Sequence, residues 1–421
     1  MDIKNYSKSE LKARLDELNN IYAGYKAMNL SLNMARGKPC KEQVSLSDDM
    51  LSADLFKSFA AEDGTEIRNY GNLDGIPECK RLFSEILGVP ADNIIVFGNS
   101  SLNIMYDYIA QCMIFGAGDT PWLKCDKVKF LCPVPGYDRH FGILESFGIE
   151  MINIPMTNEG PDMDMIEELV KDSSVKGLFC VPMYSNPGGV TYSDETVKRF
   201  ASLKPAAKDF RVIWDNAYCV HHLSDDCDSL LNIFDEAAKF NNEDLFIEVT
   251  STSKISFPGA GISALAASKN NIAAIKKRMT VQTIGHDKIN QYRHAAYFKN
   301  LDGIKNQMKK HAEIIKPKFD AVLEIFSREL EGKGIAKWNS PKGGYFISLD
   351  VVPGTAKKVV ALCKEAGVVL TGAGATYPYG KDPEDKNIRI APTFPSYDEI
   401  VKAAEILCVC VEKAAIESIT E

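Results

Sequence analysis

The chain has 421 residues, of which 25% are charged, and a formal net charge of −8. This length is sufficient for one large and one smaller domain, each with its own apolar core. The acidic balance excludes the basic stripe or Lys/Arg block that binding to nucleic acid or to an anionic membrane requires. Small-molecule chemistry is therefore the expected type of function.

Two further features bear on location and on metals. The N-terminus is polar, and no stretch approaches 18 apolar residues without charge, so we expect a cytoplasmic protein with no signal peptide and no membrane partner. The eleven cysteines are scattered, with no Cys-x-x-Cys pair and no histidine at metal-ligand spacing. We expect reduced thiols and predict no metal site.

The N-terminal and central parts of the chain differ in their apolar spacing. A helix is predicted over 8–29 from apolar residues at roughly helical spacing, which are Leu11, Leu15, Leu18, Ile21 and Tyr22. From about 45 to 300, short apolar runs alternate with helix-like segments, which is typical of a mostly parallel sheet with helices on both faces. The predicted strands are 94–98, 129–133, 151–156, 177–182, 210–218, 245–251 and 263–268.

The C-terminal part is predicted to form a second domain. A long helical stretch over 301–331 is followed by a break at Gly332 and Gly334. Strands are expected at 345–351, 368–371 and 387–392, and helices near 356–366 and 396–417. The last helix should begin after Ser396, because Ser396 and Glu399 form a capping-box pattern.

Polar residues follow several of the predicted strands. In an open parallel sheet, ligands gather outside the carboxyl ends of the strands. Ser100 and Ser101 precede a helix, where hydroxyls and backbone N–H groups suit a phosphate, although such a turn alone is usually only a helix cap. Tyr137 can lie flat on an aromatic ring, and Asn186 can donate to an oxygen from a Pro-Gly-Gly loop.

Asp215, Tyr218 and Lys254 point to a pyridoxal phosphate cofactor. A carboxylate at the end of an apolar strand needs a cation or a strong donor opposite it, and a pyridinium N–H is such a partner. Tyr218 can donate to the ring 3-oxygen, and Lys254 can form an imine with the aldehyde and later act as general base and acid at the substrate Cα. Ser251 and Ser253, just before the lysine, can reach the phosphate. Asp215 or Tyr218 in isolation is readily explained as structural, so the prediction depends on the combination.

Arg389 lies within an apolar strand of the predicted second domain. Its planar guanidinium suits bidentate binding of a substrate α-carboxylate. Without that context, a strand arginine that reaches solvent is an equal alternative.

Taken together, these residues resemble the fold-type I pyridoxal phosphate enzymes of the aminotransferase class I superfamily, over essentially the whole chain. The family's order is kept by Asn186-Pro187-Gly188-Gly189, Asp215 with Tyr218, Ser251-Thr252-Ser253-Lys254 and Arg389. Segments 34–39, 68–71, 98–106 and 287–294 resemble a divergent bacterial group of aspartate aminotransferases. The resemblance implies an α/β fold in which a large cofactor-binding domain (46–305) with a mostly parallel seven-stranded sheet adjoins a smaller α+β domain (306–421). Residues 1–45 would form an arm that joins the smaller domain.

The resemblance also implies a role for each site residue. Lys254 would be the Schiff-base lysine, Asp215 would pair with the pyridine nitrogen, and Tyr137 would stack on the ring. Tyr218 and Asn186 would bind the 3-oxygen. The phosphate would be held by Ser100, Ser101, Ser251 and Ser253, with Tyr70 reaching it from a second subunit, so that a homodimer is implied. Contacts to the substrate would come from Arg389, Asn186, Gly37 and Arg36.

One position departs from the family's pattern. The family has a phosphate-binding arginine eight residues after the lysine, and Ile262 stands there. Backbone amides, hydroxyls and a lysine or arginine from elsewhere are expected to meet the phosphate charge instead. A dicarboxylate substrate would need a second cation, for which Arg36, Lys288 and Arg293 are the candidates.

The leading hypothesis for function is transamination by a ping-pong cycle, with L-aspartate as the donor and 2-oxoglutarate as the acceptor. Alanine, aromatic amino acids or kynurenine as substrates, or a β-lyase reaction, are the alternatives. The fold also serves as the effector-sensing domain of some bacterial transcription regulators. Only about 45 residues precede the predicted large domain, which leaves no room for a winged helix and its linker.

Overall fold

An eight-stranded sheet forms the centre of the larger body of the protein, of which our computed structural model describes residues 3–420. The strand order is β2-β9-β8-β7-β6-β3-β4-β5. Strands β4, β3, β6, β7 and β8 are parallel, whereas β9 is antiparallel to both of its neighbours and β5 is antiparallel to β4. The bounds are β2 Ile94–Phe97, β3 Lys129–Val134, β4 Glu150–Thr157, β5 Gly160–Pro161, β6 Val175–Cys180, β7 Arg211–Asp215, β8 Phe246–Ser251 and β9 Ser263–Ala267. All seven predicted strands are present, and the eighth, β5, has two residues, too few to form a recognisable apolar run.

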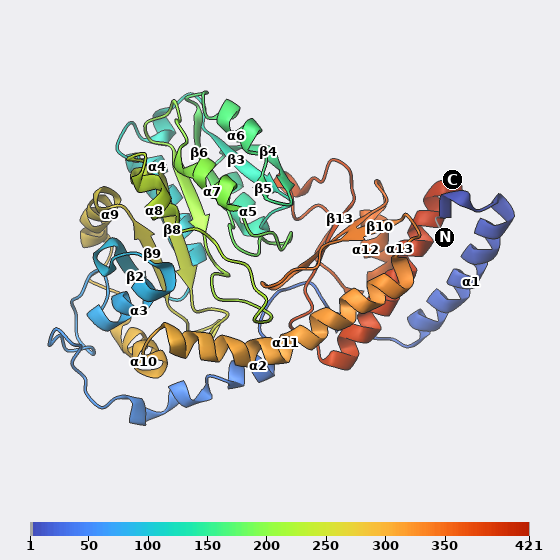
Figure 1. The fold of residues 1–421 in the computed structure, drawn as a ribbon, viewed down its shortest axis with the longest axis horizontal. Helices are drawn as coiled ribbons and strands as arrows, with labels where there is room; N and C mark the ends of the chain where they lie inside the picture. Colours follow the sequence, from blue (N-terminus) through green and yellow to red (C-terminus); the bar gives the residue numbers. More distant parts are fainter. Residues whose placement is uncertain (1–2, 421) are drawn as a thin grey trace.

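Helices cover both faces of this sheet (Figure 1). One apolar cluster joins the sheet to α4 (Ser101–Phe115), α5 (Asp138–Ser146) and α9 (Lys269–Gln282). A second cluster joins the opposite face to α6 (Met163–Leu169), α7 (Asp194–Ala201) and α8 (Ile233–Ala238). At the β2 edge, α3 (Pro77–Leu87) and α10 (Lys288–Phe298) pack together. The central strands are buried along their whole length because they are covered on both sides.

The smaller body forms around a three-stranded antiparallel sheet of order β10-β11-β13. Its strands are β10 Ala336–Trp338, β11 Ile347–Val351 and β13 Asn387–Ile390, and its C-terminal helices are α12 Ala356–Glu365 and α13 Tyr397–Thr420. The predicted capping box of α13 is confirmed, since Ser396 N–H donates to Glu399 Oε2 (2.8 Å) and Glu399 N–H donates to Ser396 Oγ (3.3 Å). One apolar cluster unites these elements.

The N-terminal segment joins the same smaller body. Helix α1 (Lys8–Ala27) packs along α13, and β1 (Leu32–Asn33) pairs in parallel with β12 (Val368–Val369). The chain then passes through α2 (Lys41–Ser45) to the larger body, and α11 (Leu301–Leu330) runs back from one body to the other (Figure 1). Our proposed domain boundary at 305/306 therefore falls inside α11. Within residues 3–420, no helix combines the length and apolarity needed to cross a membrane.

A carboxylic acid is buried in the middle of the large sheet. Glu248 on β8 is 3% exposed, and its Oε1 accepts a hydrogen bond from Asn216 Nδ2 at 2.8 Å. Burial raises the pKa of Glu248 from 4.5 to about 7, and the Asn216 hydrogen bond opposes this increase only in part. The folded protein therefore holds a proton on Glu248 at pH values where the unfolded chain has released it.

The burial of Glu248 can be tested by measuring the free energy of unfolding at different pH values. Between pH 4.5 and 7 the folded state binds more protons than the unfolded state, so stability falls as pH rises through this window. Glu248→Gln should remove this loss while keeping the Asn216 contact, so at pH 8 it should stabilise the protein by on the order of 3 kcal/mol. At pH 4.5 the effect should be small. Calorimetric unfolding at both pH values measures the difference, with the exposed Glu195→Gln as control; an equal gain at both would contradict the account.

Candidate active site

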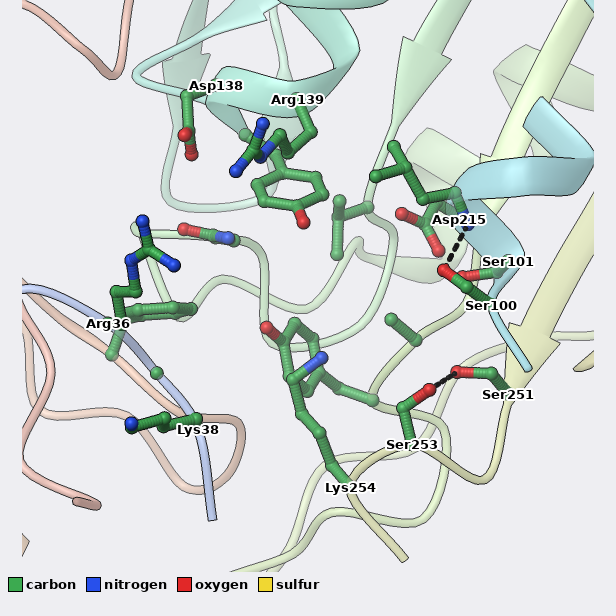
Figure 2. A pocket seen from close by; sticks show the side chains of 18 of the residues that line it. Arg36, Lys38, Ser100, Ser101, Asp138, Arg139, Asp215, Ser251, Ser253 and Lys254 are labelled. Atoms are coloured by element: carbon green, nitrogen blue, oxygen red, sulfur yellow. Dashed lines mark hydrogen bonds between the residues drawn. The ribbon is translucent and has the colours of Figure 1, made fainter. Parts of the chain in front are cut away.

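A cavity of about 510 Å³ lies between the carboxyl ends of the large-sheet strands and the smaller body. It brings together most of the predicted site residues, which are Arg36, Gly37, Ser100, Ser101, Tyr137, Asn186, Asp215, Tyr218, Ser251, Ser253, Lys254 and Arg389. Asp215 is the last residue of β7 and Ser251 the last residue of β8, so the sheet itself sets their positions. Figure 2 shows the serines at one end of the cavity and Arg36, Asp138 and Arg139 at the other.

Asp215 is a buried carboxylate of which only one oxygen has a hydrogen-bond partner. It is 2% exposed, and its Oδ2 lies 2.9 Å from Nε2 of His140, a residue of α5. Its Oδ1 is buried and has no partner among residues 3–420. Because an unpaired buried carboxylate oxygen is costly, this oxygen marks the position of a donor that a ligand would supply.

Lys254 lies beside two aromatic rings within the cavity. Its Nζ is 5.0 Å from the ring centre of Tyr218 and 5.9 Å from that of Tyr345. Burial lowers the pKa of the Lys254 amine, and the Asp215 carboxylate opposes this effect. A lowered pKa increases the fraction of neutral amine, which is the nucleophilic form.

The serines form an anion-binding end of the cavity. Ser100 is the N-cap of α4, and its Oγ accepts from Leu102 N–H at 3.2 Å. Ser251 Oγ donates to Ser253 Oγ at 3.1 Å (Figure 2). The 15-residue helix α4 adds its N–H groups and the positive end of its dipole. This arrangement suits a phosphate group.

Ile262 cannot contribute to that end of the cavity. Its side chain is 1% exposed and belongs to the apolar cluster around α3, β2 and β9. Its main chain is also engaged, because Ile262 N–H donates to Thr252 Oγ1 (3.0 Å) and Ile262 O accepts from Thr252 N–H (2.8 Å). In the described part of the chain, the basic residues that line the cavity are Arg36, Lys38, Arg139, Lys254 and Arg389.

Arg389 on β13 forms the link between the two bodies at the other end. It is 7% exposed, and its Nη1 lies 2.7 Å from Asp138 Oδ1 and 3.3 Å from Asn186 Oδ1. Its Nη2 lies 3.4 Å from Thr371 Oγ1, and its Cζ is 5.0 Å from the ring centre of Phe346. Gly37 packs directly against that ring. A Cβ at this position would lie 2.4 Å from Phe346 Cζ, so a larger residue would clash with the ring.

Three residues singled out in the sequence lie outside the cavity of their own chain. Tyr70 is 79% exposed and lines a separate surface hollow together with Lys288. Lys288 Nζ donates to Gly71 O at 3.1 Å, and Arg293 Nη2 donates to Asn290 Oδ1 at 2.5 Å. The reach of Tyr70 into a second subunit stays a prediction, and of the three cation candidates only Arg36 lines the cavity.

Several residues of the cavity and its support were not identified from the sequence, among them Lys38, Asp138, Arg139 and His140. Asp138, Arg139 and His140 follow Tyr137 directly, at the start of α5. A signal was present, because acidic and basic residues immediately after a predicted strand belong to the same edge of the sheet as Tyr137. Lys38 adjoins the Arg36-Gly37 pair, and its Nζ lies 3.9 Å from the ring centre of Phe394.

Similar solved structures show the class of protein to which this chain belongs. The chain has a TM-score of 0.97 and 44% identity to the crystal structure of an aspartate transaminase from Corynebacterium glutamicum, covering 99% of each chain. It also has a TM-score of 0.73 and 18% identity to the Thermus thermophilus α-aminoadipate aminotransferase, which was crystallised with N-(5'-phosphopyridoxyl)-L-leucine; this match covers 92% and 93% of the two chains and shows the shared fold. The protein is an aminotransferase of fold type I.

The family follows from sequence matches over the whole chain. The aspartate amino-transferase family matches residues 6–421. The aspartate aminotransferase of C. glutamicum is 46% identical over 410 residues, covering 97% of this chain and 93% of that protein. The chain belongs to the aspartate aminotransferase family.

The contact between His140 and Asp215 can be tested by stability. His140→Phe should retain the stacking of ring 140 on Phe179 (4.6 Å, 13°) and leave both Asp215 oxygens unpartnered. We expect a loss on the order of 3 kcal/mol for this uncompensated buried group. Adding Asp215→Asn should restore part of that loss, because a neutral amide is easier to bury. Thermal unfolding of the cofactor-free variants measures this, and a double variant less stable than His140→Phe would refute the assignment.

Proposed function

We propose that this aminotransferase transfers the amino group of L-aspartate to 2-oxoglutarate, with pyridoxal 5'-phosphate as its cofactor. The observation that carries the proposal is the unpartnered, buried Asp215 Oδ1 in the same cavity as the Lys254 amine. Aspartate is favoured because the chain has 46% identity to a protein that is named an aspartate aminotransferase. The acceptor follows from the resemblance noted in the sequence.

The residues present fit this cofactor at each of its polar groups. Asp215 Oδ1 would accept the pyridine N–H, with His140 fixing the orientation of the carboxylate from behind. The phosphate would lie at the N-terminus of α4, against the hydroxyls of Ser100, Ser101, Ser251 and Ser253. Tyr218 and Asn186 would hold the 3-oxygen, and Tyr137 would cover one face of the ring. Bound there, the cofactor would withdraw electrons from the substrate Cα and so acidify its proton.

The chain's own groups then supply the proton transfer and the binding energy. Lys254 would hold the cofactor covalently and, once the substrate amine takes its place, remove the proton from Cα with its freed Nζ. The lowered pKa of this amine favours the basic, neutral form. Tyr218, buried beside it, has a pKa raised well above its ordinary value, and so remains a hydrogen-bond donor.

Arg389 would bind the α-carboxylate of the substrate through its planar guanidinium. Arg36 would contact the substrate as well, and it is the one of the three earlier cation candidates that lines the cavity. Gly37 would allow the chain to pass close to the substrate over Phe346. A dicarboxylate fits this end because Lys38 and Arg139 line it too, which gives several positive charges for a second carboxylate.

A homodimer is part of the proposal. Tyr70 is almost fully exposed and lies outside the cavity of its own chain, so its hydroxyl is available to the phosphate site of a second copy. Such a contact would add a donor to the serine end of the cavity, where Ile262 supplies no charge.

The visible spectrum of the cofactor-loaded protein tests the function. Addition of L-aspartate should replace the absorption of the lysine-bound cofactor with that of the aminated cofactor, and 2-oxoglutarate should restore the first spectrum. Lys254→Ala should abolish both changes, because it removes the covalent attachment and the base together. Alanine, aromatic amino acids and kynurenine are the comparison donors. A response to these but not to aspartate would remove aspartate from the proposal, and no response to any amino acid would overturn the function.

A further inference from the structure

Arg389 already has an anionic partner when no substrate is bound. Nη1 carries two N–H groups, and it contacts two acceptors, Asp138 Oδ1 at 2.7 Å and Asn186 Oδ1 at 3.3 Å. Nη2 contacts Thr371 Oγ1 at 3.4 Å. Nε is buried and has no acceptor among residues 3–420. A carboxylate that binds both Nη atoms must displace one of the two acceptors of Nη1, and of these two only Asp138 carries a charge.

Asp138 is exposed enough to leave this ion pair, whereas Arg389 is buried. The Asp138 side chain is 34% exposed, whereas the Arg389 side chain is 7% exposed. A carboxylate this exposed regains water when its ion pair opens, which makes its release inexpensive. The guanidinium stays buried against the Phe346 ring and would be left without an anion unless another one replaces Asp138.

Two basic residues near Asp138 can offset the negative charge that a substrate carboxylate brings. Arg36 and Arg139 lie with it at the end of the cavity away from the serines (Figure 2). Their side chains are exposed, and neither has a hydrogen bond or ion pair within the described chain. When a second carboxylate arrives at Arg389, these two groups offset the added negative charge.

We propose that Asp138 is an internal competitor for the substrate carboxylate and thereby sets the affinity of this site. In the free enzyme it neutralises Arg389, and in the complex the substrate α-carboxylate displaces it. Part of the binding energy of every carboxylate substrate is used to break this ion pair, which raises KM. The inference rests on the proposed function, because it takes Arg389 to be the α-carboxylate group.

The test uses binding of unreactive carboxylates to the cofactor-loaded protein. Succinate carries two carboxylates and propionate one, and neither has an amino group to transfer. Titration calorimetry should show that Asp138→Asn binds both ligands at least about tenfold more tightly than the wild type, because a competing charged hydrogen bond is removed. Glu145→Gln removes one negative charge from the same helix at an exposed position and should leave both dissociation constants unchanged. Asp138→Ser is the second variant if the first does not fold.

Two results would overturn the proposal. Weaker or unchanged binding in Asp138→Asn would mean that Asp138 orients Arg389, and would overturn the proposal. A gain confined to succinate would place the effect at the distal carboxylate and also overturn it. The ligand-free variant should have a lower Tm than the wild type, because Arg389 then lacks an anion. Since succinate and propionate undergo no reaction, a tighter site in a protein that fails to respond to amino acids would uphold this inference and reject the proposed function.

Discussion

The site depends on one constraint, the burial of the Asp215 carboxylate at the end of β7 with one oxygen satisfied and the other not. His140 holds Oδ2 from the start of α5, and that helix is in turn packed on the sheet by its own apolar face. Oδ1 is left without a hydrogen-bond partner in the described chain. The packing of the large sheet thus fixes the position of Oδ1 in the cavity lining. The pairing of β7 with β8 also brings Asp215 into the same cavity as Lys254, which follows β8.

The cavity separates its charges along its length. The end that suits a phosphate has serine hydroxyls and the N-terminus of α4, while the basic side chains Arg36, Arg139 and Arg389 gather toward the smaller body. The family's usual arginine is replaced by Ile262, whose side chain contributes to the core between α3 and the sheet edge. In the proposed function, the helix N-terminus and the hydroxyl donors would therefore bind the phosphate without an arginine at this position.

Much of the fold was predictable because local patterns and tertiary packing agree. The central apolar runs became strands because they are buried on both faces, whereas β4 is only partly buried. The Ser396/Glu399 pattern began α13 because both capping bonds form locally. The eighth strand was missed because a two-residue strand depends on its neighbour β4 and carries no periodicity of its own.

The site was predictable where a polar residue ends a strand, as for Asp215, Ser251 and the residues after β2. It was not predictable where the partner comes from a distant element. The Asp138–Arg389 pair joins residues 251 positions apart, and the His140–Asp215 pair joins residues 75 positions apart. Lys288 and Arg293 carry the correct charge, but their helix α10 directs them to the β2 edge and away from the cavity.

The central claim is that the free oxygen of Asp215 holds the ring nitrogen of the cofactor in its protonated form. The most direct measurement is the ¹⁵N chemical shift of ring-labelled pyridoxal phosphate bound to the wild type and to Asp215→Asn. The account predicts a protonated ring nitrogen in the wild type at neutral pH and an unprotonated one in the variant, because an amide cannot stabilise the positive charge of the ring. The same protonation state in both proteins would contradict it.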